Sequence, residues 1–266
     1  MSELKPQPSL FLPHGAPDLP LTSIPAADFL RRLSSQLPQR PDGIVIISAH
    51  WMIRGLGMTA PGPLETIHDF GGFSPELYRL TYNARGTADL SAQVQEVLAE
   101  AGQEIAQVQG RGLDHGAWVP LLMVYPEADI PVVQISLDAT RSARELVALG
   151  HALEPLRERN ILIIGSGASV HNLRRIAPEG SSVPEWARSF DDWVSDTLDS
   201  GDVATLADFE AEAPAARQAH PTTEHFLPLF VAAGAGGTGN AARKLHESFS
   251  YGSIGMSAWA FGGEEQ

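Results

Sequence analysis

The sequence predicts an α/β fold: one domain over residues 1–266, with a central, mostly parallel or mixed β-sheet and helices on both of its faces. Three observations support this prediction. Short apolar runs alternate with helical patterns along the chain, which is the order of elements in α/β domains. Hydrophobic residues make up 43% of the 266 residues, enough for a sizeable core. The Pro/Gly clusters are short and lie between adjacent elements, so none has the composition of an interdomain linker.

The predicted strands are apolar runs of four to twelve residues. Runs of this kind that are followed by small residues indicate buried strands leading into loops. The last run alternates, and we expect residues 254–261 to form a core strand rather than an interface strand. Strands are predicted at residues 9–12, 43–48, 57–60, 130–137, 161–165 and 250–261.

Helical patterns lie between these strands. Residues 88–101 are amphipathic, with leucine and valine at helical spacing. The Gly-rich stretch 234–240 lacks the Lys-Ser/Thr of a phosphate-binding loop, and we interpret it as a flexible connection between a helix and the last strand. Helices are predicted at residues 26–36, 75–80, 88–101, 119–125, 142–159 and 184–200.

Composition excludes several classes of partner and site. The formal net charge is -14 at pH 7, so phosphates would be repelled, and we expect no nucleic acid and no anionic membrane as partner. The chain has no cysteine, which excludes disulfides, a thiolate zinc site and a cysteine nucleophile. Any metal would therefore be held by imidazole and carboxylate groups.

The first residues lack the basic start and apolar stretch of a signal peptide, and no run approaches the roughly 18 apolar residues of a membrane span. We therefore expect a cytoplasmic protein. The sequence leaves its oligomeric state open.

The histidines are the most informative residues. Five of the nine lie in short segments rich in glycine, proline or serine, next to apolar runs: His14, His50, His115, His171 and His225. The ends of buried strands are where α/β folds build their sites. A single histidine there is explained by a turn hydrogen bond, but several together favour a metal centre.

The segment 220–225 offers three candidate ligands. His225 is predicted at the start of a helix, with Pro221 in the first turn and a neighbouring threonine as cap, so that its ring projects from a rigid element. His220 and Glu224 are the other two. Glu224 and His225 differ by about 100° around a helix, so we expect only one of them to face a metal.

His171 and His115 are candidates for acid–base chemistry. His171 follows an apolar strand and Gly165-Ser-Gly167, and it is either a ligand, a general base or a helix-capping residue. His115 lies between Asp114 and Gly116, so a carboxylate could fix its tautomer, or its ring could donate to a bound oxygen. Asp114 is equally well explained as the N-cap of the next helix.

A loop of aromatic and glycine residues supplies candidates for substrate contact. His68, Phe70 and Phe73 lie in His68-Asp-Phe-Gly-Gly-Phe73, a type of loop that closes over a planar molecule. Alternatively, the two phenylalanines only anchor the loop on the core. His151 and His246 lie in charged or polar segments, and we assign both to the surface or to packing.

Six short motifs occur in order over about residues 10–260. They are Pro13-His-Gly-Ala-Pro17, Ser48-Ala-His-Trp51, Thr66-Ile-His-Asp-Phe-Gly-Gly-Phe73, Asp114-His-Gly-Ala-Trp118, Gly165-Ser-Gly167 with His171-Asn-Leu173, and Pro221-Thr-Thr-Glu-His-Phe-Leu-Pro228. In this combination the chain resembles the class III extradiol ring-cleavage dioxygenases of the LigB type, most closely the 4,5-DOPA dioxygenase extradiol-like branch. Each motif alone is weak, whereas six in order are specific.

The resemblance implies a mononuclear non-haem Fe(II) held by His14, His50 and a third ligand. In the resembled branch the third ligand is the histidine, His225, while other members use a carboxylate, which keeps Glu224 as an alternative. By the same resemblance His171 is the catalytic base and a possible fourth ligand, and His115 is a second acid/base or oxygen-stabilising group. Zn(II) is expected to compete for the site in purified protein.

The implied reaction inserts both atoms of O2 into a catechol-type ring, DOPA-like or small, and gives a muconic semialdehyde. The sequence leaves open which catechol is cleaved and whether cleavage is 4,5 or 2,3. Two alternatives remain: a zinc-dependent hydrolase, in which Glu224 helps to activate water, and a non-catalytic scaffold of the same fold. The intact histidines argue against a scaffold, which needs no imidazoles converging at strand ends.

Overall fold

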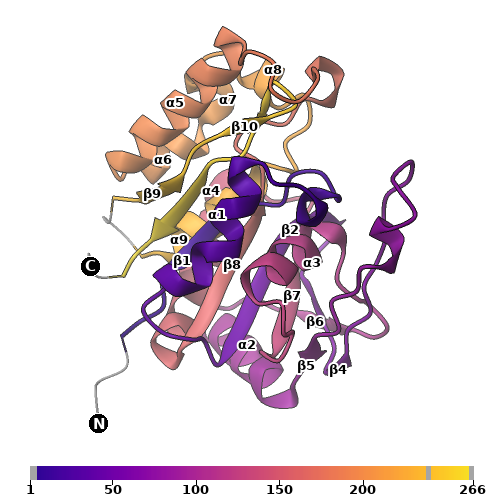
Figure 1. Cartoon of the computed structure of the whole chain (residues 1–266). Coiled ribbons are helices and arrows are strands. Elements are labelled where there is room, and N and C mark those ends of the chain that lie inside the picture. Colours follow the sequence, from indigo (N-terminus) through magenta and orange to yellow (C-terminus); the bar gives the residue numbers. More distant parts are fainter. Residues whose placement is uncertain (1–4, 238–240, 264–266) are drawn as a thin grey trace.

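A computed structural model describes residues 5–237 and 241–263. Its centre is an eight-stranded mixed sheet (Figure 1). Across the sheet the strands follow the order β6 (Ala106–Val108), β3 (Gly57–Thr59), β7 (Val132–Asp138), β2 (Gly43–Ile53), β8 (Ile161–Gly167), β1 (Ser9–Pro13), β12 (Ala258–Phe261) and β9 (Arg243–His246). Two small ladders pair β4 (Gly62–Pro63) with β5 (Arg85–Gly86) and β10 (Phe249–Ser250) with β11 (Ile254–Gly255).

The centre of the sheet is parallel and its margins are mixed. Strands β7, β2, β8 and β1 run in one direction, whereas β12 is antiparallel to both β1 and β9. Strand β3 pairs with β7 in the antiparallel direction and with β6 in the parallel one. The predicted fold class is therefore confirmed in its sheet, and the parallel centre brings the carboxyl ends of four strands to one edge.

Apolar side chains cover both faces of the central strands. In β2, Val45 and Ile47 join one hydrophobic cluster, while Ile44 and Ile46 join the cluster on the opposite face. Because successive side chains of a strand point to opposite faces, a run that is apolar at every position is what a strand covered on both sides requires. The apolar runs in the sequence are uninterrupted because both faces of these strands are buried.

Helices complete both clusters, as predicted. Helices α1 (Pro25–Leu33) and α3 (His115–Val124) cover one face of the sheet. The other face packs against α2 (Ala88–Glu100), α4 (Ala143–Leu153), α5 (Glu185–Asp199) and α9 (Leu227–Ala235). Three short helices lie between α5 and α9 in the chain: α6 (Val203–Ala207), α7 (Phe209–Glu212) and α8 (Ala216–Ala219). No helix among the described residues is long and apolar enough to cross a membrane.

Several predicted boundaries were wrong for local reasons. The helix predicted at 75–80 is only a 3-10 turn at Leu77–Arg79. The helix predicted at 142–159 ends at Leu153, where Pro155 and a 3-10 segment follow. Residues 250–261 form three short strands instead of one. Of the predicted flexible connection 234–240, the first two residues extend α9, and residues 238–240 lie outside the described part of the chain.

Helices α4 and α9 cross closely at two glycines. A Cβ on Gly150 would lie 2.2 Å from the carbonyl oxygen of Val231, and one on Gly234 would lie 2.1 Å from that of Val147. These distances leave no room for a side chain, because backbone atoms would have to move. The glycines therefore set how closely α9 approaches the sheet, and α9 follows directly on the segment that carries His225.

We expect Gly150→Ala to destabilise the fold. Overpacking of a tight helix crossing costs about 1–3 kcal/mol, more than the ~1 kcal/mol that alanine gains over glycine in helix propensity. The midpoint of urea unfolding, followed by circular dichroism, should fall. Gly71→Ala is the control, because nothing lies within 4 Å of its added Cβ. Equal midpoints for the two variants would contradict the close crossing.

Candidate metal centre

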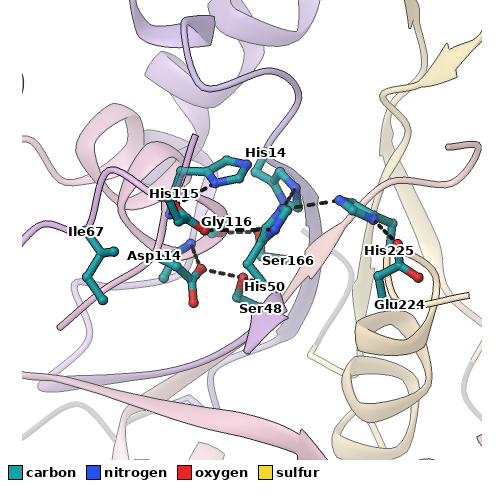
Figure 2. A network of polar contacts seen from close by, with 12 residues as sticks. His14, Ser48, His50, Ile67, Asp114, His115, Gly116, Ser166, Glu224 and His225 are labelled. Atoms are coloured by element: carbon teal, nitrogen blue, oxygen red, sulfur yellow. Dashed lines mark hydrogen bonds and ion pairs between the residues drawn. The ribbon is translucent and has the colours of Figure 1, made fainter. Parts of the chain in front are cut away.

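Three histidine rings from distant parts of the chain meet at the carboxyl edge of the central strands (Figure 2). The Nε2 atom of His50 lies 3.2 Å from Nε2 of His14 and 3.2 Å from Nε2 of His225. His14 and His225 are buried, and His50 is partly exposed. The three ring nitrogens therefore face one another at the end of the sheet.

Different elements position each ring. His14 directly follows β1, and its backbone N–H donates to the carbonyl of Gly167 at the end of β8. His50 lies in β2 where the pairing with β7 shifts register between Ile47 and Met52. This irregularity interrupts the ladder at His50, and irregularities of this kind re-aim side chains near functional sites.

His225 reaches the site from a turn, not from a helix. Residues 221–226 form turns and α9 begins only at Leu227, so the expected helical position of His225 was wrong. The carbonyl of His225 accepts from the backbone N–H of Ala168, and a Cβ on Gly167 would lie 2.0 Å from that carbonyl. Only glycine at position 167 allows the turn to approach β8 this closely.

Hydrogen bonds fix the tautomers of two rings. Ser166 Oγ donates its proton to the carbonyl of Gly116, so it accepts from Nδ1–H of His14 at 3.0 Å. Nδ1 of His225 lies 3.4 Å from Oε1 of Glu224, which can only accept because it is ionised. A neutral imidazole carries one N–H, so Nε2 of both rings presents a lone pair.

Burial keeps the three rings neutral. Burial and the neighbouring histidines hold the pKa of His14 well below its usual range. Burial, opposed in part by Asp114 and Asp69, lowers the pKa of His50 to about 4. Burial lowers the pKa of His225 to about 3, although its bond to Glu224 opposes the shift. Three neutral imidazoles whose Nε2 atoms converge form a cation site.

The nitrogen separations fit a metal ion. Two ligands at about 2.1 Å from a metal lie ~3.0 Å apart at an octahedral angle and ~3.4 Å apart at a tetrahedral one. The observed 3.2 Å lies between these values. The wider cluster contains two candidate ligand groups that share no residue, His14 with His50 and His115, and His171 with Glu224 and His225. The 3.2 Å contact between Nε2 of His50 and Nε2 of His225 joins the two groups. All five predicted site histidines are thus brought together.

His115 lies beside the triad formed by His14, His50 and His225, and it has a hydrogen-bond partner of its own. Its ring centroid is 3.9 Å from that of His50 and 5.5 Å from that of His14. Asp69 Oδ1 accepts from Nδ1 of His115 at 2.9 Å and from its backbone N–H at 3.0 Å. Burial would raise the pKa of Asp69, but the bonds from His115 lower it to about 2.

Asp114 acts as the N-cap of α3, and accepts from the backbone N–H of Ala117. It is fully buried and also accepts from Ser48 Oγ at 2.6 Å and from Arg111 at 2.7 Å. The capping interpretation of Asp114 is therefore correct, and the carboxylate that holds His115 is Asp69. Neither Asp69 nor Ser166 was selected from the sequence, although each lies within a motif quoted above.

His171 stacks on His225, with ring centroids 3.5 Å apart and planes at 10°. Burial lowers the pKa of His171 to about 4, with a smaller opposing effect from Glu224. Its neighbour Asn172 accepts from the backbone N–H of Arg174 and so provides the local cap. His171 therefore faces the site as a neutral base, and the capping interpretation applies to the residue after it.

Glu224 and His220 lie behind His225. The bond to His225 lowers the pKa of Glu224 to about 2, and its carboxylate contacts Nδ1, the ring nitrogen on the far side from the converging Nε2 atoms. His220 is buried and its Nε2 lies 2.8 Å from the carbonyl oxygen of Ser169. His220 is thus engaged in the core, away from the triad.

The aromatic loop borders the site on the side of His115. Phe70 packs perpendicular to the His115 ring at a centroid distance of 5.7 Å, and Phe73 contacts Phe70 at 5.4 Å. Nε2 of His68 lies 3.0 Å from the carbonyl oxygen of Leu80, which ties the start of the loop to a later segment of the chain. Phe70 and Asp69 are thus the members of this loop that contact His115. Of the two histidines assigned elsewhere, His246 stacks on Phe29 at 4.8 Å.

Comparison with known proteins identifies relatives of the whole chain. Residues 13–262 match the family described as the catalytic LigB subunit of aromatic ring-opening dioxygenase. The chain is 37% identical over 256 residues to a 4,5-DOPA dioxygenase extradiol of Beta vulgaris, covering 95% of this chain and 96% of that one. It is 38% identical over 235 residues to a 4,5-DOPA dioxygenase extradiol of Escherichia coli K12, covering 86% and 84%.

A solved structure agrees with these relatives. An uncharacterized protein of Escherichia coli K12 superposes with a TM-score of 0.79 at 33% identity, covering 96% of this chain and 100% of that one. Its fold is thus shared over nearly the full length of both chains. With the sheet, the histidine cluster and these matches in agreement, the chain belongs to the family of the catalytic LigB subunit of aromatic ring-opening dioxygenases.

Proposed function

We propose that this protein, as one catalytic domain over residues 1–266, is an extradiol dioxygenase that cleaves a catechol-type ring with O2. The observation that carries the proposal is the convergence of three neutral imidazoles, His14, His50 and His225, on one point. Relatives named 4,5-DOPA dioxygenase extradiol support the same reaction class. The product is a muconic semialdehyde.

The donor set fits a divalent metal, with His14, His50 and His225 as its ligands and His171 as a possible fourth. We propose Fe(II) as the native ion. Fe(II), when bound, supplies the redox chemistry that lets a catechol react with O2, whereas Zn(II) has no redox chemistry and would occupy the site without turnover. Three protein ligands also leave positions open for small molecules.

The residues around the triad orient the substrate and handle its protons. Phe70 and Phe73 offer an aromatic wall beside His115 for the planar ring, and the contact of His68 with Leu80 anchors the start of that loop. His171, neutral at pH 7, accepts a proton from a catechol hydroxyl, and His115 serves the second acid–base position. A proton acceptor is needed because a catechol binds a metal better after losing its protons.

The zinc-hydrolase alternative has weaker support. It requires Glu224 next to a water at the open positions, but this carboxylate contacts Nδ1 of His225, on the other side of the ring from Nε2. Glu224 is better explained as the residue that orients His225, since metal-binding histidines commonly donate their second N–H to a carboxylate.

Oxygen uptake tests the proposal. Protein reconstituted anaerobically with Fe(II) should consume O2 in a fixed ratio to an added catechol and form a yellow semialdehyde, while the Zn(II) form should consume none. A panel of L-DOPA, catechol and protocatechuate ranks substrates, and mass and NMR spectra of the product distinguish 4,5 from 2,3 cleavage. Absence of uptake with every diol, despite stoichiometric Fe(II), would refute the dioxygenase assignment.

A further inference from the structure

Asp69 and His115, which lie outside the proposed set of metal ligands, form a hydrogen-bonded pair. A single carboxylate oxygen, Oδ1, accepts two hydrogen bonds from His115, one from Nδ1 at 2.9 Å and one from the backbone N–H at 3.0 Å. Asp69 stays ionised, since its pKa is lowered to about 2. Because Oδ1 accepts the backbone N–H of His115, it also acts as the acceptor toward the ring, so Nδ1 carries a proton.

This tautomer determines what the other nitrogen can do. With the proton on Nδ1, Nε2 of His115 carries a lone pair and can take up a proton but not give one. Phe70 packs against the ring at 90°, which limits its rotation. His115 also lies among the ligand atoms of the cluster, within 4.8 Å of those of His14 and His50. The His115 ring therefore lies directly beside a proposed metal ligand, His50, at a centroid distance of 3.9 Å.

His171 is held differently. In the part of the chain that the structure describes, its ring stacks on His225 but no hydrogen-bond partner fixes either of its nitrogens. Among the described residues, His115 has a carboxylate hydrogen-bonded to its ring, whereas Glu224, which lies near His171, bonds to His225 instead. A carboxylate that accepts from Nδ1 in this way prepares a histidine as a general base, and Asp69 does so although its side chain is 25% exposed.

We propose that Asp69 is a positioning residue, which holds His115 as the Nδ1–H tautomer and so makes its Nε2 an acceptor for a catechol proton. The inference rests on the proposed function. In this step the catechol O–H bond breaks, an Nε2–H bond forms, and His115 becomes an imidazolium whose charge Asp69 balances. The electron pair stays on the catechol oxygen. The proton on Nε2 of His115 is then available for donation to an oxygen atom in a later step.

Nitrogen NMR tests the tautomer without any turnover. In protein labelled with 15N-histidine and loaded with diamagnetic Zn(II), two-bond 15N–1H spectra should show His115 as Nδ1–H, with His115→Gln used for assignment. Asp69→Asn should keep this tautomer, because the backbone N–H of His115 requires an oxygen at the same place. Asp69→Ala should shift His115 toward Nε2–H. An unchanged tautomer in Asp69→Ala would overturn the proposal.

Kinetics of the Fe(II) enzyme test the consequence. Asp69→Ala should lower kcat by about 10²-fold, in the range for loss of general base catalysis, with KM and metal content changed far less. Asp69→Asn should lie between wild type and Asp69→Ala, because it keeps the hydrogen bond but loses the charge. Glu76→Gln, an exposed change outside the loop His68–Phe73, is the control.

The two proposals fail in different ways. If kcat of Asp69→Ala fell only in proportion to a loss of bound metal, Asp69 would act through His50, whose Nδ1 is 4.0 Å from Oδ2, and the positioning role would be wrong. If wild-type protein cleaved no catechol while its His115 tautomer depended on Asp69, the dioxygenase assignment would fail and the tautomer control would stand.

Discussion

His225→Ala should lose its tightly bound metal and, with it, all measurable ring cleavage. The Nε2 atom of His225 lies 3.2 Å from that of His50, and its removal would leave two converging nitrogens at the site. Loss of a direct ligand should weaken metal binding by more than the roughly 10–100-fold that removal of an outer partner costs. Metal content after gel filtration, measured by mass spectrometry, gives the result.

Glu224→Ala is the informative comparison. If Glu224 only orients His225 through Nδ1, its loss should weaken metal binding or activity by roughly 10–100-fold, and excess metal should restore much of the site. His151→Ala controls for loss of a histidine outside the cluster, since His151 lies in α4. Retention of metal by His225→Ala together with its loss in Glu224→Ala would identify the carboxylate as the third ligand.

The sequence could predict the sheet and the approximate place of the site because both depend on local patterns. Strands such as β2 and β8 are apolar at successive positions, since each face is covered by helices, and this pattern is visible without a structure. Parallel strands end at one edge, so histidines that follow separate strands were expected to meet. Their meeting in the structure agrees with that expectation.

Helix boundaries were less predictable, because several helices lack the local pattern that marks a helix. Helix α3 begins at His115, four residues before the predicted start, and is almost fully buried, so it has no polar face to give it helical periodicity. Helices α6, α7 and α8 are four or five residues long, too short for a periodic signal. Burial on all sides and short length both erase the pattern on which a prediction depends.

Partners across loops were the hardest part of the site to predict. Asp69 and His115 are separated by 46 positions, and their contact depends on how the loop around Phe70 folds over the cluster. Asp114, adjacent to His115 in sequence, was the natural candidate but is used as a helix cap. Asp114 points into the first turn of α3, so its position next to His115 in the sequence did not indicate a contact between the two side chains. The contact of His115 with Asp69 depends on the fold.

The metal-free protein should lose stability steeply as the pH falls from about 6.5 to 4. Burial lowers the pKa of His50, of His171 and of His220 to about 4 each, and that of His225 to about 3. In the unfolded chain each imidazole takes up a proton near pH 6.5. Between these values the unfolded state binds more protons than the folded state, so acid favours unfolding.

The size of the effect follows from the same linkage. Each pKa unit is worth about 1.4 kcal/mol, so a few such histidines together rival the 5–15 kcal/mol that stabilises a typical domain. Asp69 and Glu224, with pKa values near 2, lose their own stabilising contribution only below about pH 4, so they do not produce this window. Urea unfolding at a series of pH values measures the slope directly.

His220→Gln isolates the contribution of one histidine. Glutamine keeps an N–H that can donate to the carbonyl of Ser169, the group that His220 contacts at 2.8 Å, but it does not titrate. The slope of the unfolding free energy against pH should fall by up to about 1.4 kcal/mol per pH unit in this window, the value for one proton. A slope equal to that of wild type would mean that His220 is protonated in the folded protein, contrary to its burial.

Metal-loaded protein should stay folded to lower pH, because protons must first displace the ion from His14, His50 and His225.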